Sequence, residues 1–253
     1  MMRRVLLALA LWSTPALAQE IPAALYAAGH YAQAEAAGEA QGDAKGAALS
    51  ARASLAAEML RATPCLDCLQ KAEAQARRAI ALDPALPEGH IYLAAALGYE
   101  ARIEGLVRAR LLDYPGQAKA NLDVALAHDP KNCWALAALG AWNIEIVHSG
   151  GETLGRWSYG AALTDGMADF AKAFASAPEN LVLRYQFALV LGGFGAERYR
   201  KEMLDALARA VSLKPLTAYE SFAQDRAREL LAALHANKDK LFAKLVRRDQ
   251  GYP

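Results

Sequence analysis

Two cysteines are the side chains whose spacing in this sequence best suits chemistry. Cys65 and Cys68 form a C-x-x-C motif just before a segment with helical periodicity. A helix N-terminus lowers the pKa of a thiol, so this placement favours thiol–disulfide exchange. However, no strand-like segment precedes the motif, as an α/β thiol oxidoreductase would require, and Leu69 stands where haem attachment needs histidine. We therefore expect a structural disulfide between Cys65 and Cys68, with thiol–disulfide exchange as the less favoured alternative.

The remaining reactive side chains show no catalytic or metal-binding spacing. The five histidines form no H-E-x-x-H or similar pair, and no serine lies in a G-x-S-x-G context. A zinc site at the C-x-x-C would need two further ligands, for which the sequence offers only Cys133 and a distant histidine. We predict that the chain is not an enzyme and uses no metal and no cofactor. Cys133 is expected to be a small buried hydrophobic residue, and its pairing stays open.

The N-terminal residues have the pattern of an export signal. Two arginines precede the apolar run Val5–Trp12, and a small-residue cleavage site follows at Ala16–Ala18. The run is shorter than the ~20 residues that cross a bilayer, so no transmembrane segment is expected. We predict a Sec signal peptide over residues 1–18, cleaved after Ala18. The protein would then be periplasmic or secreted in a Gram-negative bacterium.

The charge of the mature chain gives no reason to expect a nucleic-acid partner. Removing two arginines leaves 28 − 2 = 26 basic residues against 27 acidic ones, a formal charge of about −1. Nucleic-acid binding is usually supported by an excess of positive charge, and the mature chain has no such excess. The high alanine and leucine content favours helices along most of the chain.

One spacing pattern recurs four times along the chain. A small or apolar residue is followed four positions later by a core residue, three later by an alanine, and five later by a proline. A fresh helical segment begins after each proline, which cannot continue a helix. The positions are Ala72, Ala76, Ala79, Pro84; Ala118, Leu122, Ala125, Pro130; Gly166, Phe170, Ala173, Pro178; and Met203, Leu207, Ala210, Pro215.

This pattern resembles the second helix and closing turn of a tetratricopeptide repeat (TPR). The resemblance implies an all-α, right-handed solenoid of four to five irregular hairpins. Leu139-Gly140 matches the Leu-Gly pair of the family's first helix, where glycine allows close packing against the preceding helix. We expect one domain over residues 19–253, with a degenerate cap over 19–62, repeats over 63–215 and C-terminal capping helices over 216–253. Thr63-Pro64 is expected to cap and open the helix that carries the first copy of the pattern.

The spacing between closing prolines shows where the repeats are irregular. The intervals are 130 − 84 = 46, 178 − 130 = 48 and 215 − 178 = 37 residues, against about 34 for a regular repeat. Because each second-helix pattern is intact, the additional residues are expected between the two helices of a repeat, in Arg102–Gly116 and His148–Asp165. Leu139–Pro215 also resembles bacterial relatives of the regulator-of-microtubule-dynamics family, which implies an atypical repeat fold with such linkers.

The concave face is the expected binding surface. By the register of the family, Tyr99, Trp134, Glu145 and Tyr185 lie on it, among small residues that open a groove. The linker residues Arg156 and Trp157 are a second candidate contact. Two outcomes stay open: the linkers leave the groove free, or they fill it and turn its aromatic residues into ordinary core.

We therefore predict an exported, non-catalytic binding or scaffold protein whose groove takes a peptide or a partner protein. The first alternative is a periplasmic solute-handling subunit that binds a small ligand, which a closed apolar cavity would favour. The second alternative is a thiol–disulfide protein that uses Cys65 and Cys68.

Overall fold

The part of the chain that the structure describes folds into helices alone. The computed structural model describes residues 15–252 and has 14 helices and no strand there, which confirms the all-α prediction. The predicted signal peptide lies mostly outside the described residues. The helices are α1 (Pro15–Ala27), α2 (Tyr31–Gln41), α3 (Ala44–Met59), α4 (Leu66–Leu82), α5 (Pro87–Glu104), α6 (Leu106–Leu111), α7 (Tyr114–His128), α8 (Cys133–Gly150), α9 (Glu152–Tyr159), α10 (Leu163–Ser176), α11 (Leu181–Gly192), α12 (Arg200–Ser212), α13 (Ala218–His235) and α14 (Asp239–Asp249).

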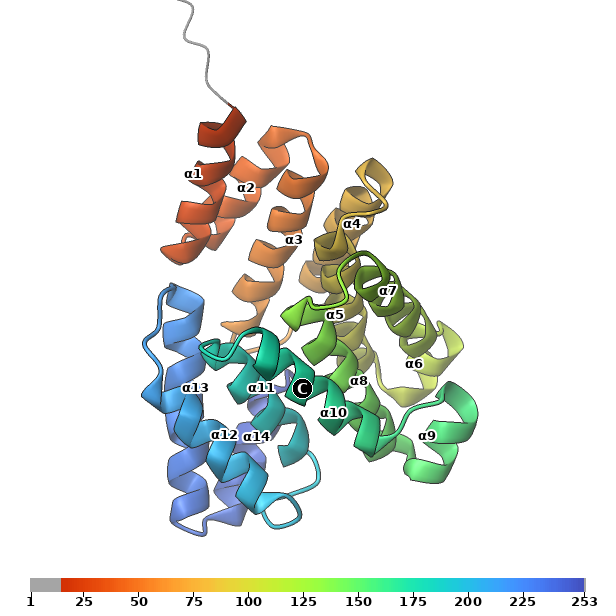
Figure 1. Cartoon of the computed structure of the whole chain (residues 1–253), viewed down its shortest axis with the longest axis vertical. Coiled ribbons are helices and arrows are strands. Elements are labelled where there is room, and N and C mark those ends of the chain that lie inside the picture. Colours follow the sequence, from red (N-terminus) through yellow and green to blue (C-terminus); the bar gives the residue numbers. More distant parts are fainter. Residues whose placement is uncertain (1–14, 253) are drawn as a thin grey trace, which may run out of the picture.

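Consecutive helices pack against each other. The long helices also form two alternating sets, and the members of one set contact one another. Thus α3, α5, α8, α11 and α13 follow one another through mutual contacts, while α4, α7, α10 and α12 pack against them in turn (Figure 1). The first set surrounds the centre of the molecule. Over the described residues, no helix is both long enough and apolar enough to span a bilayer.

The recurring sequence pattern marks the buried face of four helices. Its positions are separated by four and three residues, so each set lies on one side of its helix. α4, α7, α10 and α12 each carry one set, and every member is buried. These residues are Ala72, Ala76, Ala79, Ala118, Leu122, Ala125, Gly166, Phe170, Ala173, Met203, Leu207 and Ala210.

The four prolines that close the pattern each precede a helix by three residues. Pro84, Pro130, Pro178 and Pro215 are followed by α5, α8, α11 and α13 at that fixed distance. Side-chain caps reinforce three of these starts. The amide oxygens of Asn132 and Asn180 accept the backbone N–H groups at the beginning of α8 and α11, and the Thr217 hydroxyl oxygen accepts the Glu220 N–H at the beginning of α13. The prediction of a helix-to-helix corner at each proline is therefore confirmed.

The two long linkers fold into short helices that leave the main layers. α6 and α9 lie within the linkers, and each follows a glycine with the same backbone conformation. Gly105 has φ +84 and ψ 164, and Gly151 has φ +78 and ψ 162. A positive φ is strained for residues with a Cβ, so glycine is required at both corners. The chain therefore makes the same turn twice, once after α5 and once after α8.

Two local predictions were wrong. α4 begins at Leu66 rather than Pro64, because the sulfur of Cys65 accepts the Cys68 N–H and takes the capping place assigned to Thr63. Gly140 approaches the following helix α10 rather than a preceding one. A Cβ at Gly140 would lie 2.7 Å from the Phe170 ring and 2.9 Å from the Gly166 carbonyl oxygen.

Both terminal segments of the described chain contact helices that are distant in sequence. α1 contacts α13 across the short turn at Gly29, where a Cβ would lie 2.8 Å from that of Ala218 (Figure 1). At the other end, Arg102 on α5 donates a hydrogen bond of 3.2 Å to the carbonyl oxygen of Gln250. The apolar stripe of α14 packs inward through Phe242 and Val246, which are buried against α11 and α13.

Glu100 on α5 gives the fold a predicted pH dependence. Its side chain is buried, and burial, followed by the charge of Glu73, raises its pKa to about 7. The folded state therefore keeps a proton that the unfolded state loses near pH 4.5, so stability falls as the pH rises through 7. We expect the free energy of unfolding to drop by about 2 kcal/mol between pH 5 and pH 8. Chemical denaturation should show this drop in the wild type and in exposed Glu179→Gln, and a clearly smaller one in Glu100→Gln.

Candidate functional site

A cavity of about 270 Å³ lies at the centre of the molecule. Its walls come from α1, α3, α5, α7, α8, α11 and the start of α13, while α4, α10 and α12 contribute none of its lining. The lining residues are Tyr26, Arg52, Leu55, Ala56, Met59, Ile91, Tyr92, Ala94, Ala95, Gly98, Tyr99, Arg102, Ala118, Leu122, Trp134, Ala137, Ala138, Ala141, Trp142, Glu145, Val182, Leu183, Gln186, Val190, Thr217, Tyr219 and Glu220.

Small side chains on two helices create the space of the cavity. α5 contributes Gly98 with two alanines, and α8 contributes three alanines to the wall. A Cβ built at Gly98 meets no atom within 4 Å, so this position opens directly into the cavity. Larger residues at these sites would fill the centre and bring α5 and α8 to ordinary core packing.

Aromatic side chains surround this space and remain uncharged. Six of them line the cavity, and burial raises the pKa of Tyr92 to about 12 and the pKa of Tyr219 well above its usual range. Their hydroxyl groups are therefore neutral donors at physiological pH. Trp142 donates its indole N–H to the Pro115 carbonyl oxygen at 2.9 Å, which fixes that ring in the wall. Trp134 is 36% exposed and stands at the edge of the cavity.

One ion pair lies within the wall, and a second arginine packs on an aromatic ring. Arg102 on α5 forms an ion pair with Glu145 on α8, and its guanidinium lies 4.8 Å from the centre of the Tyr99 ring. Burial lowers the pKa of Arg102, but Glu145, Tyr99 and Tyr252 together raise it by more, so the guanidinium stays charged. Arg52 lies 4.2 Å over the Tyr26 ring. A mostly apolar ligand with one polar group would find both an apolar wall and a charge-bearing partner here.

A second, smaller cavity adjoins the first. It measures about 220 Å³ and lies between the segment after α3 and the C-terminal residues Arg248–Tyr252. Met59 and Tyr99 line both cavities, so these two side chains separate them. The C-terminal segment is held there by the bond from Arg102 and by the Gln250 side chain, which donates to the Leu189 carbonyl oxygen at 3.1 Å.

The structure brings together three of the six residues predicted for binding. Tyr99, Trp134 and Glu145 all line the central cavity. Tyr185 is only 3% exposed and packs in the core around α11 instead. Arg156 and Trp157 lie on α9, away from the cavity. There Arg156 pairs loosely with Glu152 at 3.6 Å, and Trp157 is 82% exposed.

The two linker helices lie outside the lining of the central cavity. α6 and α9 contribute nothing to the lining, and only Arg102, at the first position of its linker, reaches the central cavity. The exposed residues Leu106, Val107 and Leu111 show that α6 turns apolar side chains to solvent. Tyr99 and Trp134 therefore border open space, whereas Tyr185 does not.

Sequence reasoning missed the part of the site that comes from the ends of the chain. Tyr26, Arg52, Tyr219 and Glu220 belong to α1, α3 and α13, which lack the repeat pattern. Their place depends on the contact between α1 and α13. The helical register within a repeat carries no information on that contact.

Two of the three cysteines form the predicted disulfide, and the third is a free thiol. Cys65 and Cys68 form a disulfide with a Cα–Cα distance of 5.3 Å, which confirms the predicted bridge. Cys133 is a free thiol, half-buried at the start of α8, and burial raises its pKa. Among the described residues, the one group of acidic, histidine and cysteine side chains close enough to share a metal ion is Glu58, Cys65 and Cys68.

Comparisons with known proteins give no family for this chain. A search with protein-family models found no match, and a search of curated proteins found no significant relative.

The ion pair in the cavity wall makes a testable contribution to stability. Glu145→Gln leaves Arg102, whose side chain is only 14% exposed, without its carboxylate. Because a largely buried cation loses its countercharge, we expect a loss of about 1–2 kcal/mol in the free energy of unfolding. Urea denaturation checks this. The control Glu152→Gln removes an exposed pair on α9 and should change stability by less than about 0.5 kcal/mol. Equal effects of the two variants would contradict the expectation.

Proposed function

We propose that this chain is an exported, non-catalytic binding protein that takes a small, mostly apolar organic ligand into its central cavity. The cavity is the observation that carries the proposal. Its apolar and aromatic wall is built mainly from α3, α5, α8, α11 and α13. Contacts made by both terminal segments of the described chain border it. An apolar pocket with few polar groups is the usual form of a small-molecule site.

We further propose that the helices form a right-handed solenoid of four to five TPR-like hairpins. The four buried patterns, the fixed distance from each proline to the next helix and the close approach of Gly140 to Gly166 support this arrangement. Solenoids of this kind present their first helices on a concave face. In this chain that face corresponds to the cavity wall.

An export route fits two features of the chain. The sequence of residues 1–18 has the pattern of a Sec signal peptide, and cleavage after Ala18 keeps the cavity residue Tyr26. The disulfide between Cys65 and Cys68 also suits an oxidising compartment such as the periplasm. These features favour a periplasmic or secreted protein.

Mass spectrometry of the processed protein tests the proposal. Protein purified from the periplasm should carry a small organic molecule at one copy per chain under native conditions, and organic extraction should release it. Gly98→Leu, which places a side chain in the cavity, should be recovered without that molecule. If the wild type and the variant carry the same molecules in the same amounts, the cavity is not the binding site.

One observation favours a second candidate, the docking of a partner protein. Trp157 and Leu154 on α9 and Val107 on α6 are exposed apolar residues on the two inserted helices. Exposed apolar residues of this kind are frequent in protein interfaces. A protein that co-purifies with the wild type and with Gly98→Leu, but not with Trp157→Ser, would support docking at α9 rather than in the cavity.

A further inference from the structure

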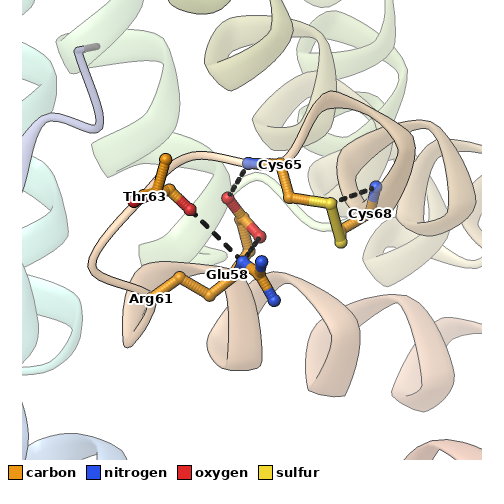
Figure 2. The surroundings of a disulfide bond; sticks show 5 residues. All are labelled: Glu58, Arg61, Thr63, Cys65 and Cys68. Atoms are coloured by element: carbon orange, nitrogen blue, oxygen red, sulfur yellow. Dashed lines mark hydrogen bonds and ion pairs between the residues drawn. A yellow bond between two sulfur atoms is a disulfide. The ribbon is translucent and has the colours of Figure 1, made fainter.

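We propose that the disulfide between Cys65 and Cys68 is redox-active and exchanges with an external dithiol, with the Glu58 carboxyl group moving the proton. The three side chains lie together where α3 ends and α4 begins (Figure 2). This activity is separate from ligand binding in the central cavity, and its test does not depend on that binding.

The position of the disulfide favours a stable thiolate. Cys65 is the N-cap of α4, a helix of 17 residues, and its sulfur accepts the Cys68 N–H at 3.2 Å. Backbone N–H groups and the helix dipole at this end favour negative charge on that sulfur. The Cys65 thiolate is therefore the better leaving group when the disulfide opens.

Glu58 provides a buried carboxyl group beside the two sulfurs. Its side chain is 3% exposed, and one carboxylate oxygen and both sulfurs lie within 4.8 Å of one another. Oε1 accepts the Cys65 N–H at 2.7 Å. Oε2 is buried without a hydrogen-bond partner among the described residues, and its contact is an ion pair with Arg61 Nε at 3.3 Å (Figure 2). Capping the Cys65 N–H occupies one oxygen only, so Oε2 keeps acceptor capacity beside its ion pair with Arg61.

The surroundings of Glu58 adjust its proton affinity. Burial raises its pKa, and the Cys65 N–H and the charge of Arg61 oppose this rise without cancelling it. Two further charged groups, Arg248 and Asp249 near the end of α14, line the same small cavity as Glu58. A carboxyl group with a raised pKa exchanges protons with a thiol more readily than an exposed one does.

The disulfide is also within reach of a partner thiol. Both cysteines are half-buried rather than enclosed, and the neighbouring residues Pro64 and Glu58 line the smaller cavity of about 220 Å³. Structural disulfides that resist reduction are commonly enclosed in the core. Partial exposure is typical of labile and catalytic ones.

The exchange can be written with all atoms and electrons in balance. A thiolate of the external dithiol attacks Cys68 Sγ, a mixed disulfide forms, and the bond to Cys65 Sγ breaks to release a thiolate. That thiolate takes the proton held by Glu58. The second thiol of the dithiol then gives its proton to the Glu58 carboxylate and attacks the mixed disulfide, which releases Cys68. The external dithiol becomes a disulfide, two electrons pass to the cysteines, and Cys68 takes that proton from Glu58. Glu58 regains its own proton from water, which had received the proton of the attacking thiol.

Reduction of the full chain by dithiothreitol tests this proposal. We expect the wild-type disulfide to be reduced faster than the same disulfide in the chain unfolded by urea, and Glu58→Gln to lower the rate at pH 7 at least tenfold, on the order of one general acid–base contribution. Glutamine keeps an acceptor for the Cys65 N–H, so this variant should fold. The control Asp67→Asn removes an exposed carboxylate from the first turn of α4 and should leave the rate within about twofold.

The pH profile provides a readout that a structural role would not change. Alkylation of the reduced wild-type cysteines should show a second ionisation above the usual range of a glutamate, and Glu58→Gln should lack it. If Glu58→Gln is unstable, the wild-type profile alone decides. Equal reduction rates in wild type and Glu58→Gln, reduction no faster than in urea, or a profile with thiol ionisation alone would each overturn the proposal.

Discussion

Gly98→Leu is expected to lower the affinity of the central cavity for an apolar probe at least tenfold while the chain stays folded. Gly98 lies in the middle of α5 and opens into the cavity, since a Cβ there meets no atom within 4 Å. Leucine therefore extends into the binding space from a Cβ that meets no neighbour. It is also a far better helix former than glycine, so stability should not fall.

The probe for this experiment is anilinonaphthalenesulfonate, whose fluorescence rises in apolar surroundings. Titration of the wild type should show one saturable site. Gly98→Ala is the matched control, because a single methyl group leaves most of the roughly 270 Å³ free and should preserve binding. Unchanged probe affinity in Gly98→Leu, with native circular dichroism, would place the binding site elsewhere.

Gly166→Ala is expected to destabilise the protein by about 2–3 kcal/mol. A Cβ at Gly166 would lie 2.8 Å from the carbonyl oxygen of Gly140 and 2.7 Å from Ile144 Cγ1. Because a backbone oxygen cannot move aside alone, α8 and α10 must separate. Such overpacking costs about 1–3 kcal/mol and exceeds the helix propensity that alanine gains.

Gly98→Ala is again the matched control for this substitution. It makes the same chemical change inside a helix, but in open space, and should raise stability by about 0.5–1 kcal/mol. Urea unfolding of both variants against the wild type measures the two effects. If Gly166→Ala is as stable as the wild type, the close contact between α8 and α10 is not needed by the fold.

Much of the helical layout could be predicted from the sequence because local rules determine it. The buried face of α10, with Gly166 and Phe170, follows from helical spacing, and the start of α8 follows from Pro130. The start of α4 could not be predicted in the same way. Thr63 and Cys65 are both able to cap a helix, and the contact with Glu58 from α3, which the local sequence does not reveal, favours Cys65.

The candidate site could be predicted only in part. Tyr99 and Glu145 follow from the register of the first helices, since each lies on the inner face of its own helix. Tyr219 enters the cavity because α13 meets α1, a contact between segments about 200 residues apart in sequence. Tyr185 shares the register of Tyr99, but its side of α11 packs into the core of the C-terminal half instead.

The most direct test of a central binding cavity uses the indole N–H signals of three tryptophans. Trp134 and Trp142 line the cavity, whereas Trp157 is 82% exposed on α9 and serves as an internal control. Two-dimensional NMR spectra during titration with anilinonaphthalenesulfonate, with signals assigned by single Trp→Phe variants, should show shifts for Trp134 and Trp142 and none for Trp157. A shift confined to Trp157, or equal shifts of all three, would contradict binding in the cavity.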